Sequence, residues 1–376
     1  MQRVLHRVDP NLVRRLASWR GEPVVTSLYL DVDGRERPVA ADCQRAFEQL
    51  ADDARRRARS WPFAEAVPSV EADLDAMRTW IARGIDRSAT RGVALFSCHD
   101  QGRFEAVELP MPVPDRVAIG PSPRIRELVE AHDPEPILLA LIDRTHLRLF
   151  RVFGHGIEEL PSTAAHHERA VDDSVELGSF ERRHEEAAHA HVRRSVADLE
   201  AAPREWSAVR IVVGGPDEPL AELERRLAPS TRTMVVGRVG VGLAAPLDEI
   251  AGAARAVGER ADRDRTAALL GDLAQRAAGA HGTAIGLDAT LTALAQQRVG
   301  VLFVKDGYWA PGVRCTSCDY VGLDRPRCPV CDTPIEIVDD VVEAAIERAV
   351  LQGADVEFCR GPELDLFGRI AAIERY

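Results

Sequence analysis

The amino-acid sequence predicts an α/β fold built from three separate domains, over residues 1–133, 134–262 and 263–376. The chain has 376 residues, whereas a typical domain has roughly 100–200. Short β-branched apolar runs, which favour strands, alternate with longer segments whose apolar residues recur at helical spacing. A proline-rich break at 133–136 marks the first boundary, and the second lies inside a long helical stretch near Asp262.

Composition narrows the class of protein. Hydrophobic residues make up 45% of the chain and charged residues 29%, which is typical of globular proteins and excludes a disordered chain or a small disulfide scaffold. No apolar run reaches the ~20 residues that a membrane helix needs. The charges of Arg3, Arg7 and Asp9 argue against a signal peptide. We therefore expect a cytoplasmic protein with no membrane partner.

The net charge of −12 means that any binding of nucleic acid must use local positive charge. The three segments carry −1, −6 and −5 in chain order, so the first is the least acidic. Every cationic residue except Lys305 is an arginine. This usage is typical of a GC-rich genome, but it also supplies planar guanidinium groups that suit phosphates and stacked bases. No DNA partner is expected.

The first segment begins with an apolar strand, Val24–Val32, which ends at an Asp-Gly turn. A helix is predicted over Ala41–Arg59, because Phe47, Leu50 and Ala54 recur at helical spacing. Further elements are predicted in this order: a helix over Val70–Arg83, strands over Gly92–Ser97 and Phe104–Leu109, a connector over Pro110–Pro123 and a helix over Arg124–Ala131.

Four arginines crowd the end of the Ala41–Arg59 helix: Arg55, Arg56, Arg57 and Arg59. Spacing alone favours a solvated helix end, where cations also interact favourably with the helix dipole. The alternative is a nucleic-acid contact, in which these guanidinium groups bind phosphates.

The second segment opens with a β-hairpin, in which a buried strand over Ile137–Asp143 precedes the alternating residues of His146–Val152. Residues 162–178 are polar and aperiodic, so we expect a mobile loop there. Other elements are predicted in this order: strand Ile157–Leu160, helix Phe180–Ala202, strand Val209–Val213, helix Leu220–Leu227, strand Thr233–Val236 and a long helix from Leu247.

The third segment starts within that long helix and again mixes strands with helices, which predicts a third α/β domain. Its elements are predicted in this order: helix Leu287–Gln297, strand Gly300–Val304, a region of paired cysteines, strand Ile335–Val338, helix Val341–Leu351, strand Asp355–Cys359 and a final strand within Leu366–Tyr376.

Four of the seven cysteines form two C-x2-C pairs, Cys315 with Cys318 and Cys328 with Cys331. Each pair can aim two thiolates at one point, so the two turns complete a tetrahedral zinc site. In a cytosolic protein this spacing favours zinc over a disulfide, and a redox pair would need only one such turn. We predict a closed, structural zinc ribbon at 308–338. The other cysteines are predicted to be small core residues: Cys43, Cys98 and Cys359.

The polar loop and the helix after it are rich in titratable side chains. Five of the eleven histidines lie there: His166, His167, His184, His189 and His191. Packing at a domain surface is favoured over metal binding, although His166 or His167 beside Asp172 or Asp173 could act as a general base. Several arginines in this stretch could bind RNA phosphates or pair with neighbouring glutamates instead: Arg169, Arg182, Arg183, Arg193 and Arg194.

Several stretches of residues 134–376, taken in order, resemble archaeal and eukaryotic class I peptide release factors and Pelota. The hairpin Ile137–Leu160 resembles the opening of their central domain, and Ser179–Leu199 resembles the helix after their Gly-Gly-Gln loop. The strand and turn at Val209–Pro216, the paired cysteines and the ending LFGRIAAIERY extend the likeness. No counterpart of the family's stop-codon-reading Asn-Ile-Lys-Ser motif occurs in the first segment. The resemblance implies an extended arrangement of the three domains and a bacterial branch similar to Balon-like ribosome hibernation or rescue factors.

The catalytic loop of that family is altered here. Counting back from Phe180 places the tip at Asp173, Ser174 and Val175, and residues 164–179 contain no glutamine. Carboxylates at this tip would be repelled by phosphates. The resemblance therefore implies a factor that occupies the ribosomal A site, on hibernating or stalled ribosomes, without releasing peptide.

The resemblance also implies partners for each domain. The first would contact rRNA at the decoding centre through its four clustered arginines. The loop of the second would approach the peptidyl-transferase centre and P-site tRNA. The third would contact a translational GTPase, with elongation factor Tu the natural candidate. Two alternatives stay open: a peptidyl-tRNA hydrolase or RNA-cleaving enzyme that uses His166 or His167, and a zinc-stabilised RNA-binding module without ribosomal specificity.

Overall fold

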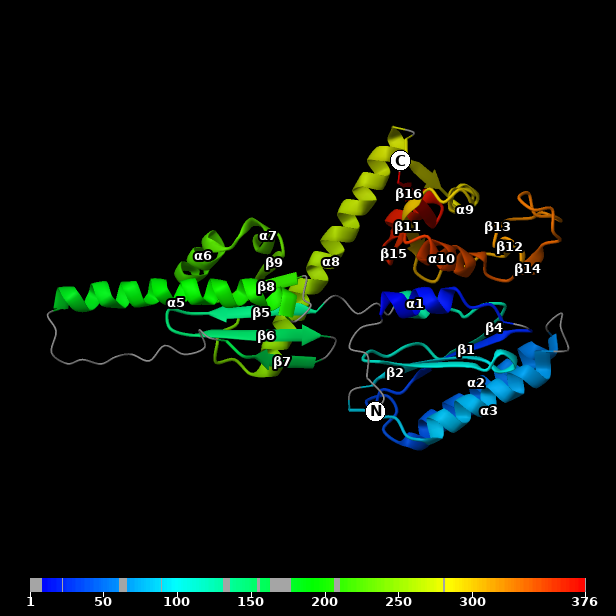
Figure 1. Ribbon diagram of the computed structural model, residues 1–376, viewed down its shortest axis with the longest axis horizontal. Coiled ribbons are helices and arrows are strands. Elements are labelled where there is room, and N and C mark those ends of the chain that lie inside the picture. The colour runs from blue at the N-terminus through cyan, green and yellow to red at the C-terminus, as the bar shows by residue number, and fades with distance from the viewer. Residues whose placement is uncertain are drawn as a thin grey trace. The chain divides into compact units, whose positions relative to one another are not determined.

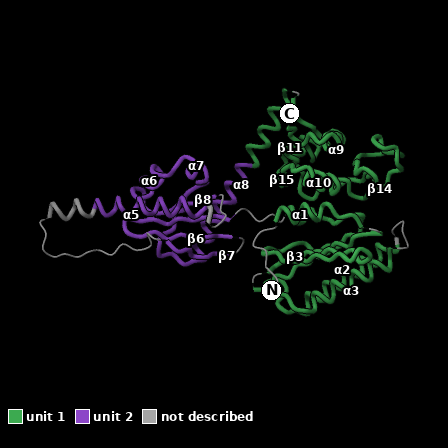
Figure 2. The backbone as a smooth tube through the Cα atoms, in the orientation of Figure 1, with its two compact units in different colours: residues 1–132, 266–376 green, residues 133–265 purple. Residues whose placement is uncertain are grey.

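The computed structural model describes residues 9–21, 23–60, 66–88, 90–130, 136–153, 156–162, 177–205, 210–279 and 281–375. The chain divides into two compact units, one formed by residues 1–132 with 266–376 and the other by residues 133–265 (Figure 2). The boundary at 265/266 lies within one long helix, α8 (Leu247–Ala278). No helix of the described residues is long and apolar enough to cross a membrane.

The N-terminal part of the first unit is an antiparallel sheet with helices on both faces (Figure 1). The strand order is β3-β2-β1-β4, formed by β1 (Val25–Asp31), β2 (Gly92–Cys98), β3 (Arg103–Leu109) and β4 (Arg116–Gly120). One face packs against α2 (Ala40–Ser60) and α3 (Ala66–Ala82), and the other against α1 (Pro10–Ala17) and α4 (Arg126–Glu130). Both faces of β1 are buried, so residues 25–30 are all buried, including the polar Thr26 and Ser27.

The C-terminal part of the same unit has a sheet of its own. Its order is β10-β16-β11-β15, formed by β10 (Thr283–Ile285), β16 (Ile370–Glu374), β11 (Val299–Lys305) and β15 (Asp355–Cys359). One face packs against α9 (Leu287–Ala295) and α10 (Val341–Leu351), and the other against the end of α8 and the 3₁₀ helix η2 (Pro362–Phe367). A small sheet of order β13-β12-β14 carries the paired cysteines; its strands are β12 (Gly312–Arg314), β13 (Val321–Gly322) and β14 (Glu336–Val338).

The second unit is a mixed sheet of order β7-β6-β5-β8-β9 between helices. Its strands are β5 (Ile137–Ile142), β6 (Leu147–Phe153), β7 (Gly156–Leu160), β8 (Arg210–Gly214) and β9 (Val235–Val239). One face packs against α5 (Leu177–Glu205) and α6 (Asp217–Arg226), and the other against the start of α8. Gly215 directly follows β8 at a position where only glycine fits, because a Cβ there would lie 1.9 Å from the carbonyl oxygen of Ile142.

The predicted α/β class is confirmed, and each of the three predicted segments contains its own sheet. The three domain boundaries themselves stay a prediction. The segments predicted as the first and third domains pack together in one compact unit. Their contact involves residues far apart in the sequence, which local patterns do not reveal.

Some elements differ from their predicted bounds. Helix α1 was not predicted, although Asp9 caps it and Pro10 occupies its first turn. The short helix α7 (Pro229–Arg232) delays the next strand, so β9 begins at Val235 and not at Thr233. Helix α5 begins at Leu177, three residues before the prediction. Residues 163–176 of the predicted mobile loop lie outside the described residues.

Candidate functional site

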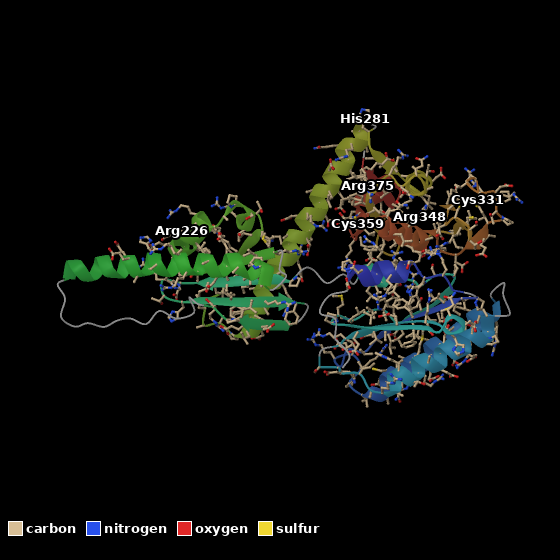
Figure 3. The ribbon with its side chains drawn as sticks, in the orientation of Figure 1. Arg226, His281, Cys331, Arg348, Cys359 and Arg375 are labelled. Atoms are coloured by element: carbon tan, nitrogen blue, oxygen red, sulfur yellow. The ribbon has the colours of Figure 1, made fainter. Side chains whose placement is uncertain are left out.

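The paired cysteines converge on the small sheet of the first unit. Cys315 and Cys318 lie between β12 and β13, while Cys328 and Cys331 lie between β13 and β14. The four Sγ atoms all lie within 4.8 Å of one another; 3.5 Å separates Cys315 from Cys331, and 3.4 Å separates Cys318 from Cys328. Figure 3 labels Cys331 in this region, apart from Cys359 of the larger sheet.

The two cysteine turns have the same backbone structure. In the first, the Cys315 N–H donates to the Tyr320 carbonyl oxygen at 2.8 Å, and the Asp319 N–H donates to the Cys315 carbonyl oxygen at 3.0 Å. The second turn repeats both bonds, at 2.9 and 3.0 Å. Asp319 and Asp332 follow the second cysteine of each turn, with φ of 56° and 58°. Aspartate tolerates this left-handed conformation better than most residues, so both turns can close tightly.

Four thiols at this spacing fit one tetrahedral metal ion. Zn–S bonds of about 2.3 Å would separate the sulfurs of such a site by about 3.8 Å, close to the observed spacing. The sulfurs are too far apart for disulfides, and all seven cysteines are free thiols. Burial and the neighbouring thiols raise the pKa of Cys318 to about 12. A central cation would stabilise the Cys318 thiolate against this cost.

Each cysteine turn also carries an arginine–aspartate ion pair, which the cysteine spacing alone did not suggest. The motif Arg-Cys-x-x-Cys-Asp begins at Arg314 and again at Arg327. Arg314 binds Asp319 at 2.9 Å, and Arg327 binds Asp332 at 2.8 Å. The Arg314 side chain is 6% exposed, whereas that of Arg327 is 57% exposed. The repeat is visible in the sequence, but the difference in burial depends on packing.

Arg314 belongs to a buried ionic cluster that joins distant parts of the first unit. Its guanidinium donates two hydrogen bonds to Glu347 of α10, at 2.8 and 3.0 Å, and Glu347 is 2% exposed. Arg20, which follows α1, binds Glu347 at 2.9 Å and Asp319 at 3.1 Å. Ser122, which follows β4, donates to Glu347 at 2.6 Å and accepts from Arg314 at 3.0 Å. We call these five residues the knuckle cluster.

A second group of buried charges lies along the same contact. Glu343 of α10 accepts N–H bonds from Ile125 at 2.7 Å and Arg126 at 3.2 Å, and the Arg124 guanidinium lies 3.7 Å away. Arg124 also binds Glu127 at 2.8 Å. Burial raises the pKa of Glu343 to about 8, despite the opposing effect of Arg124. Buried polar contacts thus hold the N- and C-terminal parts of this unit together.

The four arginines predicted to contact RNA lie on the last turns of α2. Arg55 is held at 3.0 Å by one carboxylate on α2 and another on α3. Arg56 and Arg57 share Asp53, at 3.1 and 2.9 Å. Arg59 is exposed and forms no ion pair with any residue that the structure describes. The structure therefore places all four on one helix end, with carboxylates beside three of them.

Much of the predicted central site lies outside the described residues, namely His166, His167, Arg169, Asp173, Ser174 and Val175. Arg182 and Arg183 lie on α5, but their side chains are also outside the described part. Further along α5, Arg193 is exposed and Arg194 is half-buried. His189 binds Glu222 at 2.7 Å, whereas His191 is fully buried. These last two histidines have separate environments and do not form a joint site.

Residues 123–282 match the family described as bacterial archaeo-eukaryotic release factor family 10. Over this stretch, the predicted bacterial branch of the release factor and Pelota superfamily is confirmed. A comparison with curated proteins gives no match.

Several solved structures are similar to this chain at low sequence identity. The crystal structure of the archaeal translation termination factor aRF1 is 16% identical, with 97% of this chain and 96% of that chain covered, at a TM-score of 0.25. Pelota of Archaeoglobus fulgidus is 14% identical, with 73% and 75% covered, at a TM-score of 0.36. A model of ribosome-bound archaeal Pelota and ABCE1 is 14% identical, with 73% and 72% covered, at a TM-score of 0.43.

Proposed function

We propose that this protein is a translation factor that occupies the A site of hibernating or stalled ribosomes without releasing peptide. One observation carries the proposal: the family match at 123–282 spans the loop at 164–179, and that loop contains no glutamine. The match supports a role like that of a release factor. The loop lacks the glutamine of the Gly-Gly-Gln motif, on which peptide release by the class I release factors that this chain resembles depends.

The predicted loop tip offers no obvious replacement for that glutamine. Val175 has no polar side-chain group with which to orient a water molecule. The carboxylates of Asp172 and Asp173 would be repelled by the phosphates of the peptidyl-transferase centre. A loop of this composition suits a plug or a probe of the A site better than a hydrolytic centre.

Contact with rRNA is proposed for the arginine-rich end of α2. Exposed ion pairs such as those of Arg56 and Arg57 contribute only about 0.2–1 kcal/mol. Phosphates could therefore replace Asp53 as the partner of Arg56 and Arg57 at a small cost in free energy. Arg59 forms no ion pair with a described residue, so it could bind a phosphate without losing one. Further phosphate contacts are proposed for the arginines of the central loop and α5, with P-site tRNA or rRNA as the partner.

We also propose that the metal held by the four cysteines is zinc and that its role is structural. Four protein ligands leave no open position for a substrate or an activated water. The C-terminal part would then be free to contact a translational GTPase such as elongation factor Tu. That partner is proposed from family analogy alone.

Co-sedimentation with bacterial ribosomes tests the proposed binding, with deacylated tRNA in the A site as competitor. The protein should pellet with empty ribosomes, and both A-site tRNA and added salt should displace it. Binding to free RNA but not to ribosomes would favour a general RNA-binding module instead. Binding that A-site tRNA leaves unchanged would place the factor elsewhere on the ribosome.

A peptidyl-tRNA hydrolase is the competing function, because His166 and His167 lie in the loop near two aspartates. In that case wild-type protein should release peptide from stalled ribosomes. A His166→Ala, His167→Ala double variant should lose that release but still bind.

A further inference from the structure

We propose that the first cysteine turn is also a docking surface, which holds the N-terminal part of the chain (residues 9–130) against the C-terminal part (residues 281–375). Metal binding and this internal docking would then be coupled. The proposal concerns the free protein, so it stands or falls independently of ribosome binding. Its basis is the knuckle cluster, in which one turn supplies two of the five side chains.

The first step is positional. Arg314 directly precedes Cys315, and Asp319 directly follows Cys318. Whatever orders the two cysteines therefore also orders both charged side chains. The Asp319 N–H bond to the Cys315 carbonyl oxygen, at 3.0 Å, closes the turn and fixes where the aspartate lies. A metal ion bound by the thiols would hold this turn closed.

The second step is electrostatic. The knuckle cluster contains two guanidinium groups and two carboxylates, and both guanidinium groups bind Glu347. Glu347 is almost wholly buried and depends on Arg314 for its bidentate partner. If the turn opened, Glu347 would keep Arg20, which is partly exposed, as its only cationic partner among the described residues. A buried carboxylate that loses one of its cationic partners destabilises the folded structure around it.

The third step is mechanical. Arg20 and Ser122 belong to the N-terminal part, and Glu347 belongs to α10. The next turn of α10 packs Val350 and Leu351 against the apolar cluster that contains α1. Loss of the ionic contact should therefore loosen the packing of α1 on α10. The effect would extend beyond the cysteine ribbon itself.

The second cysteine turn supplies an internal control. Its pair, Arg327 with Asp332, matches the first in sequence spacing and in backbone geometry. Both side chains are exposed, and they bind each other within the turn. Asp332→Asn therefore removes the equivalent arginine–aspartate ion pair of the second turn. It leaves the knuckle cluster unchanged.

Hydrogen–deuterium exchange of the full-length, zinc-loaded protein compares these two variants, with bound metal measured in each. Asp319→Asn should raise amide exchange in α1 and α10 by roughly tenfold, as expected for a residue in a coupled network. Asp332→Asn should raise exchange only within the ribbon. Equal effects of the two variants on α1 and α10 would overturn the proposal.

Two further experiments test the coupling even if the Asp319→Asn variant no longer binds zinc. Arg20→Gln alters neither turn, so it should retain one zinc per chain and still raise exchange in α1. Chelation of zinc under reducing conditions should raise exchange in α1 and α10 of the wild type, and raise it less in Arg20→Gln, where docking is already weakened. The coupling would be refuted if amide exchange in Arg20→Gln equalled that of the wild type. It would also be refuted if chelation left exchange in α1 and α10 unchanged.

Discussion

At the scale of single residues, the four clustered thiols should decide whether the ribbon at 308–338 folds. Cys328→Ser should abolish binding of one zinc per chain and unfold the ribbon, because structural zinc sites of this type contribute about 10–16 kcal/mol of binding free energy. Cys43→Ser is the control, since Cys43 is buried in the N-terminal core away from the cluster. Elemental analysis of reduced, freshly purified protein measures the metal. Wild-type protein without metal would contradict the assignment.

Glu343 gives a prediction about pH. Burial raises its pKa from 4.5 to about 8. Between these values the folded protein keeps a proton that the unfolded chain loses, so stability falls as the pH rises, by at most about 1.4 kcal/mol per pH unit from this group. The contribution of Glu343 to stability is fully present below the pKa of this group in the unfolded chain. It is lost as the pH rises through about 8, the pKa in the folded protein.

Glu343→Gln keeps the side chain neutral at every pH and should remove this dependence. Its Tm relative to wild type should therefore increase as the pH is raised from about 5 to about 8. Thermal unfolding across that range measures the difference. Glu186→Gln, at an exposed position on α5, is the control and should show no such trend. A pH-independent difference for Glu343→Gln would mean that this carboxyl is ionised in the folded protein.

At the scale of elements, the two ends of α2 allow a matched test of RNA contact. Arg56 and Arg45 are 67% and 69% exposed, and each pairs with an aspartate three residues earlier at 3.1 and 3.0 Å. Arg56→Glu should weaken ribosome binding and reduce its salt dependence, because one phosphate contact is lost. Arg45→Glu should leave both unchanged.

The quadruple replacement of Arg55, Arg56, Arg57 and Arg59 by Glu should reduce ribosome occupancy further, as measured by co-sedimentation at moderate salt. If Arg45→Glu weakens binding as much as Arg56→Glu, the effect is one of net charge. The contact would then not lie at the end of α2.

Elements with strong local signals could be predicted from the sequence, and the cysteine ribbon with them. The spacing of the four cysteines predicted that their thiols converge, and the apolar, β-branched residues of 24–32 predicted a strand, but not its burial on both faces. The knuckle cluster could not be predicted, because Arg20 and Glu347 are more than 300 residues apart in the chain. Their partnership depends on tertiary packing, which leaves no periodic pattern. The short helix α7 was missed for a different reason: four residues are too few to show helical spacing.

At the scale of the whole molecule, the fold and the proposed function rest on different parts of the chain. The family match covers 123–282, which includes the second unit and its loop. The first unit instead supplies the cysteine ribbon and the arginine-rich end of α2. Metal-stabilised docking is therefore proposed for the first unit, and loss of the release chemistry for the second.

We propose that the factor binds the A site yet does not hydrolyse peptidyl-tRNA. The most direct measurement is single-turnover release of labelled peptide from ribosomes that carry peptidyl-tRNA in the P site and are saturated with the factor. Release should stay at the background rate while the factor remains bound, because the loop at 164–179 lacks a glutamine. Rapid release by the wild type, lost in the His166→Ala, His167→Ala double variant, would contradict it and identify a hydrolase with a substituted base.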